Sequence, residues 1–211
     1  MFGMSTAHNP TPSPIKIEVW TDFVCPFCLL GEHVIEQAAR GLPVTIQWQP
    51  FELRPHPTPT LRPEDEYLPR VWKAAVYPMA EQLGVPIQLP SVSPQPYTRK
   101  AFLGLQFAEQ HGQGNAYVSA VMQAFFQQDK NIGEDSMLKD ILSGLGLDPT
   151  GLDAVVQSPS ANAAHDEALA RAYALGVRSV PSLRLNGQLF SGVPDAESLR
   201  TVLLNLTGQA Q

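Results

Sequence analysis

Residues 21–30 read Thr21-Asp22-Phe23-Val24-Cys25-Pro26-Phe27-Cys28-Leu29-Leu30 and contain both cysteines of the 211-residue chain. Residues 15–20 before them alternate apolar and polar side chains and are rich in β-branched types, which predicts a strand. Apolar residues after the cysteines recur at helical spacing up to Gly41. The Cys-x-x-Cys pair therefore lies where a strand passes into the first turn of a helix, a position that Pro26 suits. Free amides and the helix dipole favour an anion there, so a thiol becomes a nucleophile more easily.

Three interpretations of Cys25 and Cys28 compete. Two free cysteines can pack as small buried hydrophobic residues. A structural zinc site needs four ligands, but the chain has no second cysteine pair, and His33 alone does not complete a site. The spacing and the position at a helix start favour a redox-active dithiol, with no metal.

Composition limits the possible partners and the possible cellular compartment of the protein. A net charge of −6 argues against nucleic acid as a partner, because binding it requires a basic face. Residues 1–14 contain no Lys or Arg and three prolines, which predicts a disordered arm and not a secretory signal. No apolar run is long enough to span a membrane. We therefore expect a cytoplasmic protein, in which a lone Cys-x-x-Cys is more often catalytic than structural.

The first part of the chain predicts a βαβ unit. Residues 43–50 form a second strand, parallel to the first through a right-handed crossover. Residues 50–63 are rich in proline and should form a loop.

Residues 64–175 predict helices. The first is interrupted by Pro69 and Pro78, and a proline-rich loop over 85–96 follows it. Further helices are expected over these ranges: 97–111, 115–128, 134–145, 149–157 and 160–175.

The last part of the chain returns to a strand pattern. Asn186-Gly187 is a strong hairpin signal and should join two antiparallel strands. Asp195 should cap a final helix over 195–206. Four apolar residues of this helix are expected to face inward: Leu199, Val202, Leu203 and Leu206.

The assembled order is β-α-β, a helical block, then β-β-α. This order predicts an α/β fold with a mixed four-stranded sheet. The expected domains are one made of residues 15–63 and 176–211, and an all-helical domain of residues 64–175 inserted into it.

Together these segments resemble a known family. The frame with Cys-x-x-Cys at the start of its first helix resembles the thioredoxin fold, and the helical insertion resembles the DsbA family. The stretches that most resemble its FrnE-like branch, and its relatives the 2-hydroxychromene-2-carboxylate isomerases, are DFVCPFCLLGE, IQWQPFELRP, QDKNIGEDSML and GVRSVPSLRLNGQLFSGVP.

The resemblance assigns roles to individual residues. It implies that Cys25 is the exposed nucleophile and that Cys28 is the resolving cysteine. It implies a cis bond at Val180-Pro181, whose backbone would present an edge to an extended substrate. Pro26 and Phe27 would tune the redox poise, and no cofactor is implied.

Two departures from the family pattern stand out. The buried acid that many relatives carry six residues before the first cysteine is replaced by Val19. Asp22 is a candidate replacement as proton acceptor, and its alternatives are a solvated loop residue or a helix cap. The second cysteine pair of some FrnE-like proteins is also absent, which excludes a relay to it.

The predicted function is thiol–disulfide exchange with protein disulfides or dithiols, or with glutathione. One alternative is a glutathione-dependent isomerase or transferase of the kappa type, whose members carry Ser in place of Cys25. The other is a redox-independent chaperone or binding module that uses the helical block. The direction of exchange and the oligomeric state are not predicted.

Other polar and aromatic residues carry weaker signals. Trp20 and Trp48 are expected in the core, Arg54 in a structural role, and Asn131 in a turn. The five histidines are scattered, and surface or cap positions are expected for them.

Overall fold

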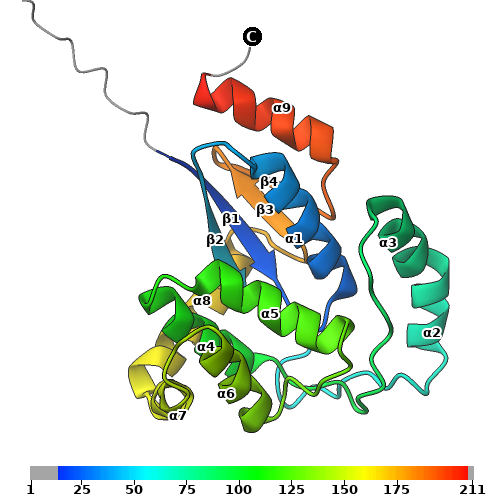
Figure 1. Cartoon of the computed structure of the whole chain (residues 1–211), viewed down its shortest axis with the longest axis vertical. Coiled ribbons are helices and arrows are strands. Elements are labelled where there is room, and N and C mark those ends of the chain that lie inside the picture. Colours follow the sequence, from blue (N-terminus) through cyan, green and yellow to red (C-terminus); the bar gives the residue numbers. More distant parts are fainter. Residues whose placement is uncertain (1–13, 209–211) are drawn as a thin grey trace, which may run out of the picture.

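The structure is a computed structural model that describes residues 14–208. Its centre is a four-stranded sheet in the order β2-β1-β3-β4 (Figure 1). The strands are β1 (Ile15–Thr21), β2 (Val44–Pro50), β3 (Ser182–Leu185) and β4 (Gln188–Ser191). β1 pairs with β2 in parallel and with β3 in antiparallel, and β3 pairs with β4 in antiparallel. The predicted mixed sheet is confirmed. The predicted arm at residues 1–14 falls almost wholly outside the described residues.

β1 is buried on both of its faces because helices cover each one. Ile17 and Val19 cluster with buried residues of α1 (Pro26–Ala39) and α9 (Ala196–Thr207), which pack against each other. Trp20 points the other way and packs on Ala172 of α8 (Pro159–Ala174). The alternation of side chains along a strand thus produces two layers of helix around the sheet. As predicted, Trp20 and Trp48 are both buried.

The remaining helices lie between β2 and β3 in the chain. Their bounds are α2 (Tyr67–Val71), η1 (Trp72–Val76), α3 (Tyr77–Leu83), α4 (Arg99–Gln110), α5 (Gly114–Phe126), α6 (Asp135–Gly144) and α7 (Thr150–Gln157). η1 is a π-helical segment that joins α2 to α3, so the expected interruption is a change of helix type. One hydrophobic cluster includes residues of the sheet, α1 and α4–α6. The division into two domains therefore stays a prediction.

The C-terminal hairpin forms as the turn residues predict. Asn186 and Gly187 have φ angles of 48° and 80°, the left-handed conformation that a tight hairpin turn requires. The Asp195 side chain caps α9 by accepting a hydrogen bond from the Ser198 amide, at 2.8 Å. The cap and the hairpin are both confirmed.

The expected inward face of α9 is only half right. Leu199 and Leu203 are buried, but Val202 and Leu206 are 43% and 40% exposed. Residues three and four apart share one side of a helix, so the four predicted residues form a broad face, and only the stripe with Leu199 and Leu203 is buried. α9 packs through the narrow stripe alone, because only one side of it meets α1 and β1.

Within residues 14–208, no helix is both long and apolar enough to cross a membrane.

Candidate active site at the start of α1

The two cysteines occupy the first turn of α1. Cys25 is the residue at the N-cap, with extended backbone angles, and Pro26 follows it in the first turn. The Cys28 amide donates to the Cys25 carbonyl at 3.0 Å. Both cysteines are free thiols and both are buried, 5% and 1% exposed, so Cys25 is not the exposed side chain that the resemblance implies. Cys25 lies at the positive end of the helix, with Cys28 one turn behind it.

Burial suppresses ionisation of the Cys28 thiol. The pKa of Cys28 is raised well above its ordinary value, mainly because burial disfavours the thiolate, and the neighbouring Cys25 raises it further. Cys28 thus keeps its proton at neutral pH. A group nearby must take that proton before Cys28 can act as a nucleophile.

The loop before β3 covers the sulfur of Cys25. The Cys25 thiol donates to the Val180 carbonyl with a sulfur–oxygen distance of 3.6 Å, and the Val180–Pro181 bond is cis. The Pro181 ring packs on Gly31 of α1, where an added Cβ would lie 3.0 Å from the Pro181 Cγ. The absence of a side chain at Gly31 thus allows this loop to approach the cysteines.

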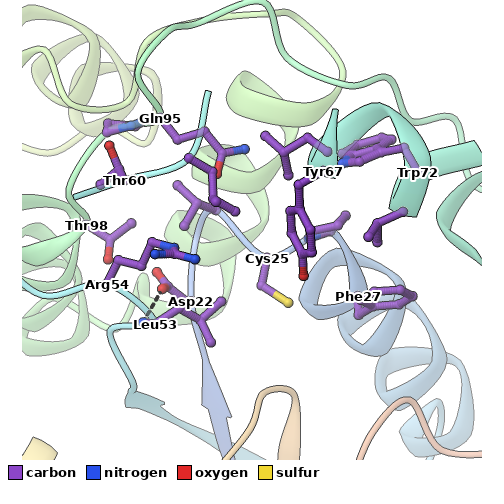
Figure 2. Close-up of a pocket in the computed structure, with 16 residues that line it drawn as sticks. Asp22, Cys25, Phe27, Leu53, Arg54, Thr60, Tyr67, Trp72, Gln95 and Thr98 are labelled. Carbon is purple, nitrogen blue, oxygen red and sulfur yellow. Dashed lines mark hydrogen bonds between the residues drawn. The ribbon is translucent and has the colours of Figure 1, made fainter. Parts of the chain in front are cut away.

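A cavity of about 150 Å³ opens beside Cys25. Figure 2 shows Tyr67 and Trp72 on one side of Cys25, and Asp22 and Arg54 on the other. The residues that line it come from the start of α1, the loop after β2, α2 with η1, and residues 95–98. Pro26 and Phe27, between the cysteines, also line it. A substrate in this cavity would contact Cys25 between mainly apolar walls with one cationic side chain.

Asp22 lies in the wall of this cavity and is 1% exposed. Its Oδ2 accepts a hydrogen bond from the Leu53 amide at 2.7 Å, whereas Oδ1 has no partner (Figure 2). The pKa of Asp22 is raised to about 7, first by burial and to a smaller extent by the charge of Glu52, against hydrogen bonds with the Leu53 amide and the Thr98 side chain that lower it. Asp22 is therefore neither a solvated loop residue nor the cap of α1, which has no side-chain capping bond.

A buried pair behind Asp22 was not predicted from the sequence. His165 Nε2 lies 2.6 Å from Glu52 Oε1, and both side chains are buried. The expectation of surface or cap positions is therefore wrong for His165. The partners are 113 residues apart, and no local pattern around either of them indicates the contact. The fold creates the pair by packing α8 against the end of β2.

Comparison with known proteins places this arrangement in a family. The model of the DSBA-like thioredoxin domain matches residues 16–204. The chain belongs to this family. The uncharacterized protein YwbO of Bacillus subtilis (strain 168) is 38% identical over 180 residues, which cover 84% of this chain and 90% of YwbO.

Two solved structures share the DsbA-like fold at low sequence identity. 2-Hydroxychromene-2-carboxylate isomerase matches with a TM-score of 0.75 and 19% identity, over 92% of this chain and 97% of that one. The cytosolic disulfide reductase DsbM from Pseudomonas aeruginosa, in a structure with GSH, matches with a TM-score of 0.72 and 15% identity, over 91% and 98%. Since one fold carries both names, the residues of the site must distinguish the two activities.

Val19, at the position where the resemblance implies a buried acid, lies in β1. Val19 pairs with Trp48 of β2 and with Leu183 of β3 in the middle of the sheet, and it is buried. Asp22, a candidate replacement for that acid, lies just beyond the end of β1, in the wall of the cavity.

The weaker sequence predictions have mixed outcomes. Asn131 forms a turn, as predicted, by accepting from the Gly133 amide at 3.0 Å. Arg54 donates to the Pro59 carbonyl at 3.2 Å, a structural contact, but it also lines the cavity beside Cys25. Among the described residues, no group of three or more His, Cys, Asp or Glu side chains is arranged to hold a metal ion.

Proposed function

We propose that this DSBA-like protein is a thiol–disulfide oxidoreductase that uses Cys25 and Cys28. The observation that carries the proposal is the position of Cys25 at the start of α1, between the Val180 carbonyl and an open cavity, with Cys28 buried behind it. Backbone amides at a helix start stabilise negative charge on a sulfur during exchange. Cys25 lines the cavity in which a substrate would bind, whereas Cys28 is not among the residues that line it.

In the reducing direction, the Cys25 thiolate attacks one sulfur of a substrate disulfide. A new S–S bond joins Cys25 to that sulfur, and the other substrate sulfur leaves as a thiolate that takes a proton from water. Cys28 then loses its proton and attacks the Cys25 sulfur, which releases the second substrate thiolate. The two electrons that the substrate gains come from the dithiol, which becomes a disulfide. An external thiol, such as glutathione, resets it.

Asp22 is the proton acceptor in this proposal. A carboxyl group with a pKa of about 7 is half ionised at neutral pH, so it can take a proton and return it. The Leu53 amide holds one carboxylate oxygen, and the other has no partner. Asp22 lines the cavity beside Cys25, and its backbone contacts Cys28.

The substrate in this proposal is a disulfide in an extended peptide, or glutathione. The Val180 backbone would pair with the substrate chain next to Cys25. The apolar walls of the cavity suit the flanking side chains, and Arg54 suits a carboxylate such as those of glutathione. A cytosolic site of action, as in the name of DsbM, is part of the proposal.

Two cysteine variants test the mechanism. Cys25→Ser should abolish the reduction of insulin disulfides, because the attacking sulfur is gone. Cys28→Ser should accumulate a mixed disulfide with Cys25, visible by mass spectrometry. Retained insulin reduction in Cys25→Ser would refute the proposal.

The second candidate function is a glutathione-dependent isomerase, which the structural match to 2-hydroxychromene-2-carboxylate isomerase favours. Such an enzyme needs only bound glutathione and one activating group. Glutathione-dependent turnover that survives Cys28→Ser would support it over disulfide exchange. The presence of both cysteines counts against it.

A further inference from the structure

A further buried acid, Glu32, lies on α1, outside the cavity beside Cys25. Glu32 is only 3% exposed, and neither of its carboxylate oxygens has a hydrogen-bond partner at normal geometry, although the Ser119 hydroxyl lies close enough to lower its pKa. It lines a separate cavity of about 170 Å³. A buried carboxylate without a partner is costly, so its place in a cavity wall points to a ligand that supplies the missing contacts.

The walls of this cavity offer oxygen atoms. Gln123 Nε2 donates to Ser119 Oγ at 3.3 Å, and Gln127 Nε2 donates to the Pro86 carbonyl at 2.9 Å. Each bond uses one of the two N–H groups of its glutamine, and the amide oxygen of each side chain remains an acceptor. Hydroxyl, amide and carboxylate oxygens thus surround the same space.

The C-terminal ends of two helices add negative electrostatic potential at this cavity. Gly84 is the C-cap of α3 and Gln127 is the C-cap of α5, and both residues line the cavity. A helix C-terminus carries a partial negative charge, so two such ends favour a cation. None of the described residues that line the cavity is Lys or Arg.

The titratable groups in the cavity are all on α1. They are Glu32, Glu36 and His33, whereas α5 and residues 84–86 contribute none. The pKa of Glu32 is raised to about 8, first by burial and then by the charge of Glu36, against a smaller lowering by the Ser119 hydroxyl. Glu32 is therefore mostly protonated at neutral pH.

We propose that this cavity binds a primary alkylammonium group, with Glu32 as its anionic ligand. The three N–H bonds of such a group match carboxylate, amide and hydroxyl acceptors. Leu29, Val85 and Pro86 also line the cavity and suit the attached methylene groups. A metal ion fits less well, because the described residues contain no cluster of three metal-ligating side chains. The ammonium can belong to a free polyamine or to a lysine side chain.

Binding must displace the proton of Glu32 into solvent. The ionised fraction of a group with a pKa of about 8 rises from about one tenth at pH 7 to about nine tenths at pH 9. Affinity should therefore increase about tenfold over this range, while the amine itself stays protonated.

The test is calorimetric titration of the full chain with putrescine and, separately, with Nα-acetyl-lysine methylamide. Titration at pH 7 in two buffers of different ionisation enthalpy measures the proton released. We expect saturable binding, proton release at pH 7, and about tenfold tighter binding at pH 9. Tighter binding of putrescine indicates a polyamine, and tighter binding of the lysine derivative indicates a protein lysine.

Three variants control the test. Glu32→Gln should reduce affinity at least about tenfold and remove the proton release, because the anionic ligand is lost. Glu36→Gln, at an exposed position, should lower the pKa of Glu32, so the proton release at pH 7 and the gain in affinity between pH 7 and 9 should both shrink, which tests Glu32 even if Glu32→Gln folds poorly. Glu167→Gln removes one exposed charge on α8 and should change nothing. Equal affinity in all variants, no proton release, or a preference for Ca²⁺ over both amines would overturn the proposal.

Discussion

Asp22→Asn should make the protein more stable and a slower catalyst. The carboxyl group has a pKa of about 7 when folded, against an ordinary value of 3.8. Each unit of difference corresponds to about 1.4 kcal/mol, so ionising Asp22 in the folded state costs up to roughly 4 kcal/mol. An amide at this position can still accept from the Leu53 amide, but its nitrogen needs a new partner. We therefore expect a gain of about 2–4 kcal/mol at pH 7.5, or roughly 5–15 °C in Tm.

The pH dependence of the stability difference between Asp22→Asn and wild type identifies its cause. The folded-state pKa is raised, so the folded protein holds the Asp22 proton more tightly than the unfolded chain does. The wild type therefore has this stability below about pH 4 and loses it as the pH rises to about 7. The gap between Asp22→Asn and wild type should be small at pH 4, widen up to pH 7 and then stay constant. Urea denaturation at five pH values between 4 and 8 measures it.

The catalytic cost follows from the proposed proton transfer. Without the acceptor, release of the mixed disulfide by Cys28 should slow by about 10²-fold, the low end of general acid–base contributions. Stopped-flow measurement of the release step checks this, and the first attack by Cys25 should be unchanged. A stability gap independent of pH, or an unchanged release rate, would refute the role assigned to Asp22.

Three further changes test neighbouring parts of the site. Cys28→Ser should hold a mixed disulfide at Cys25 for at least about 10²-fold longer than wild type, measured by quenched mass spectrometry, because no resolving thiol remains. Glu52→Gln should lose about 3 kcal/mol in urea denaturation by breaking a buried pair. It should also lower the pKa of Asp22, because the charge of Glu52 raises that pKa. Urea denaturation should then show the loss of stability due to Asp22 ionisation at a lower pH than in wild type. Gly31→Ala should cost about 1–3 kcal/mol and slow insulin reduction, because its Cβ would crowd Pro181.

Local signals were sufficient to predict most of the fold. Strand alternation, the Asn186-Gly187 turn and the Asp195 cap are each encoded within a few residues, and each forms as expected. The cysteines belong to this class, since the Cys-x-x-Cys pair and its flanking strand and helix are contiguous in sequence.

Contacts between distant segments could not be predicted in the same way. Glu52 and His165 meet because α8 packs beside β2, and neither residue shows a pattern that indicates it. Glu32 looks like an ordinary charged position on a helix, and only the packing of α5 and residues 84–86 buries it. These electrostatic features depend on tertiary packing, which a helical or strand period does not describe.

The position of the acid at residue 22 has a physical explanation. At residue 19 the backbone is fully used in pairing with β2 and β3, and the surrounding side chains are apolar, so a carboxyl group would find no donor. Regular pairing ends at Thr21, where the Phe51 amide donates to its carbonyl at 3.0 Å. Beyond that point the Leu53 amide is free to bond the Asp22 carboxylate, and the cavity gives the same carboxyl group a route to solvent. In the proposed mechanism the acid must accept and return a proton, and Asp22 has the Leu53 amide as a donor and a place in the cavity wall, whereas a carboxyl group at residue 19 would have neither.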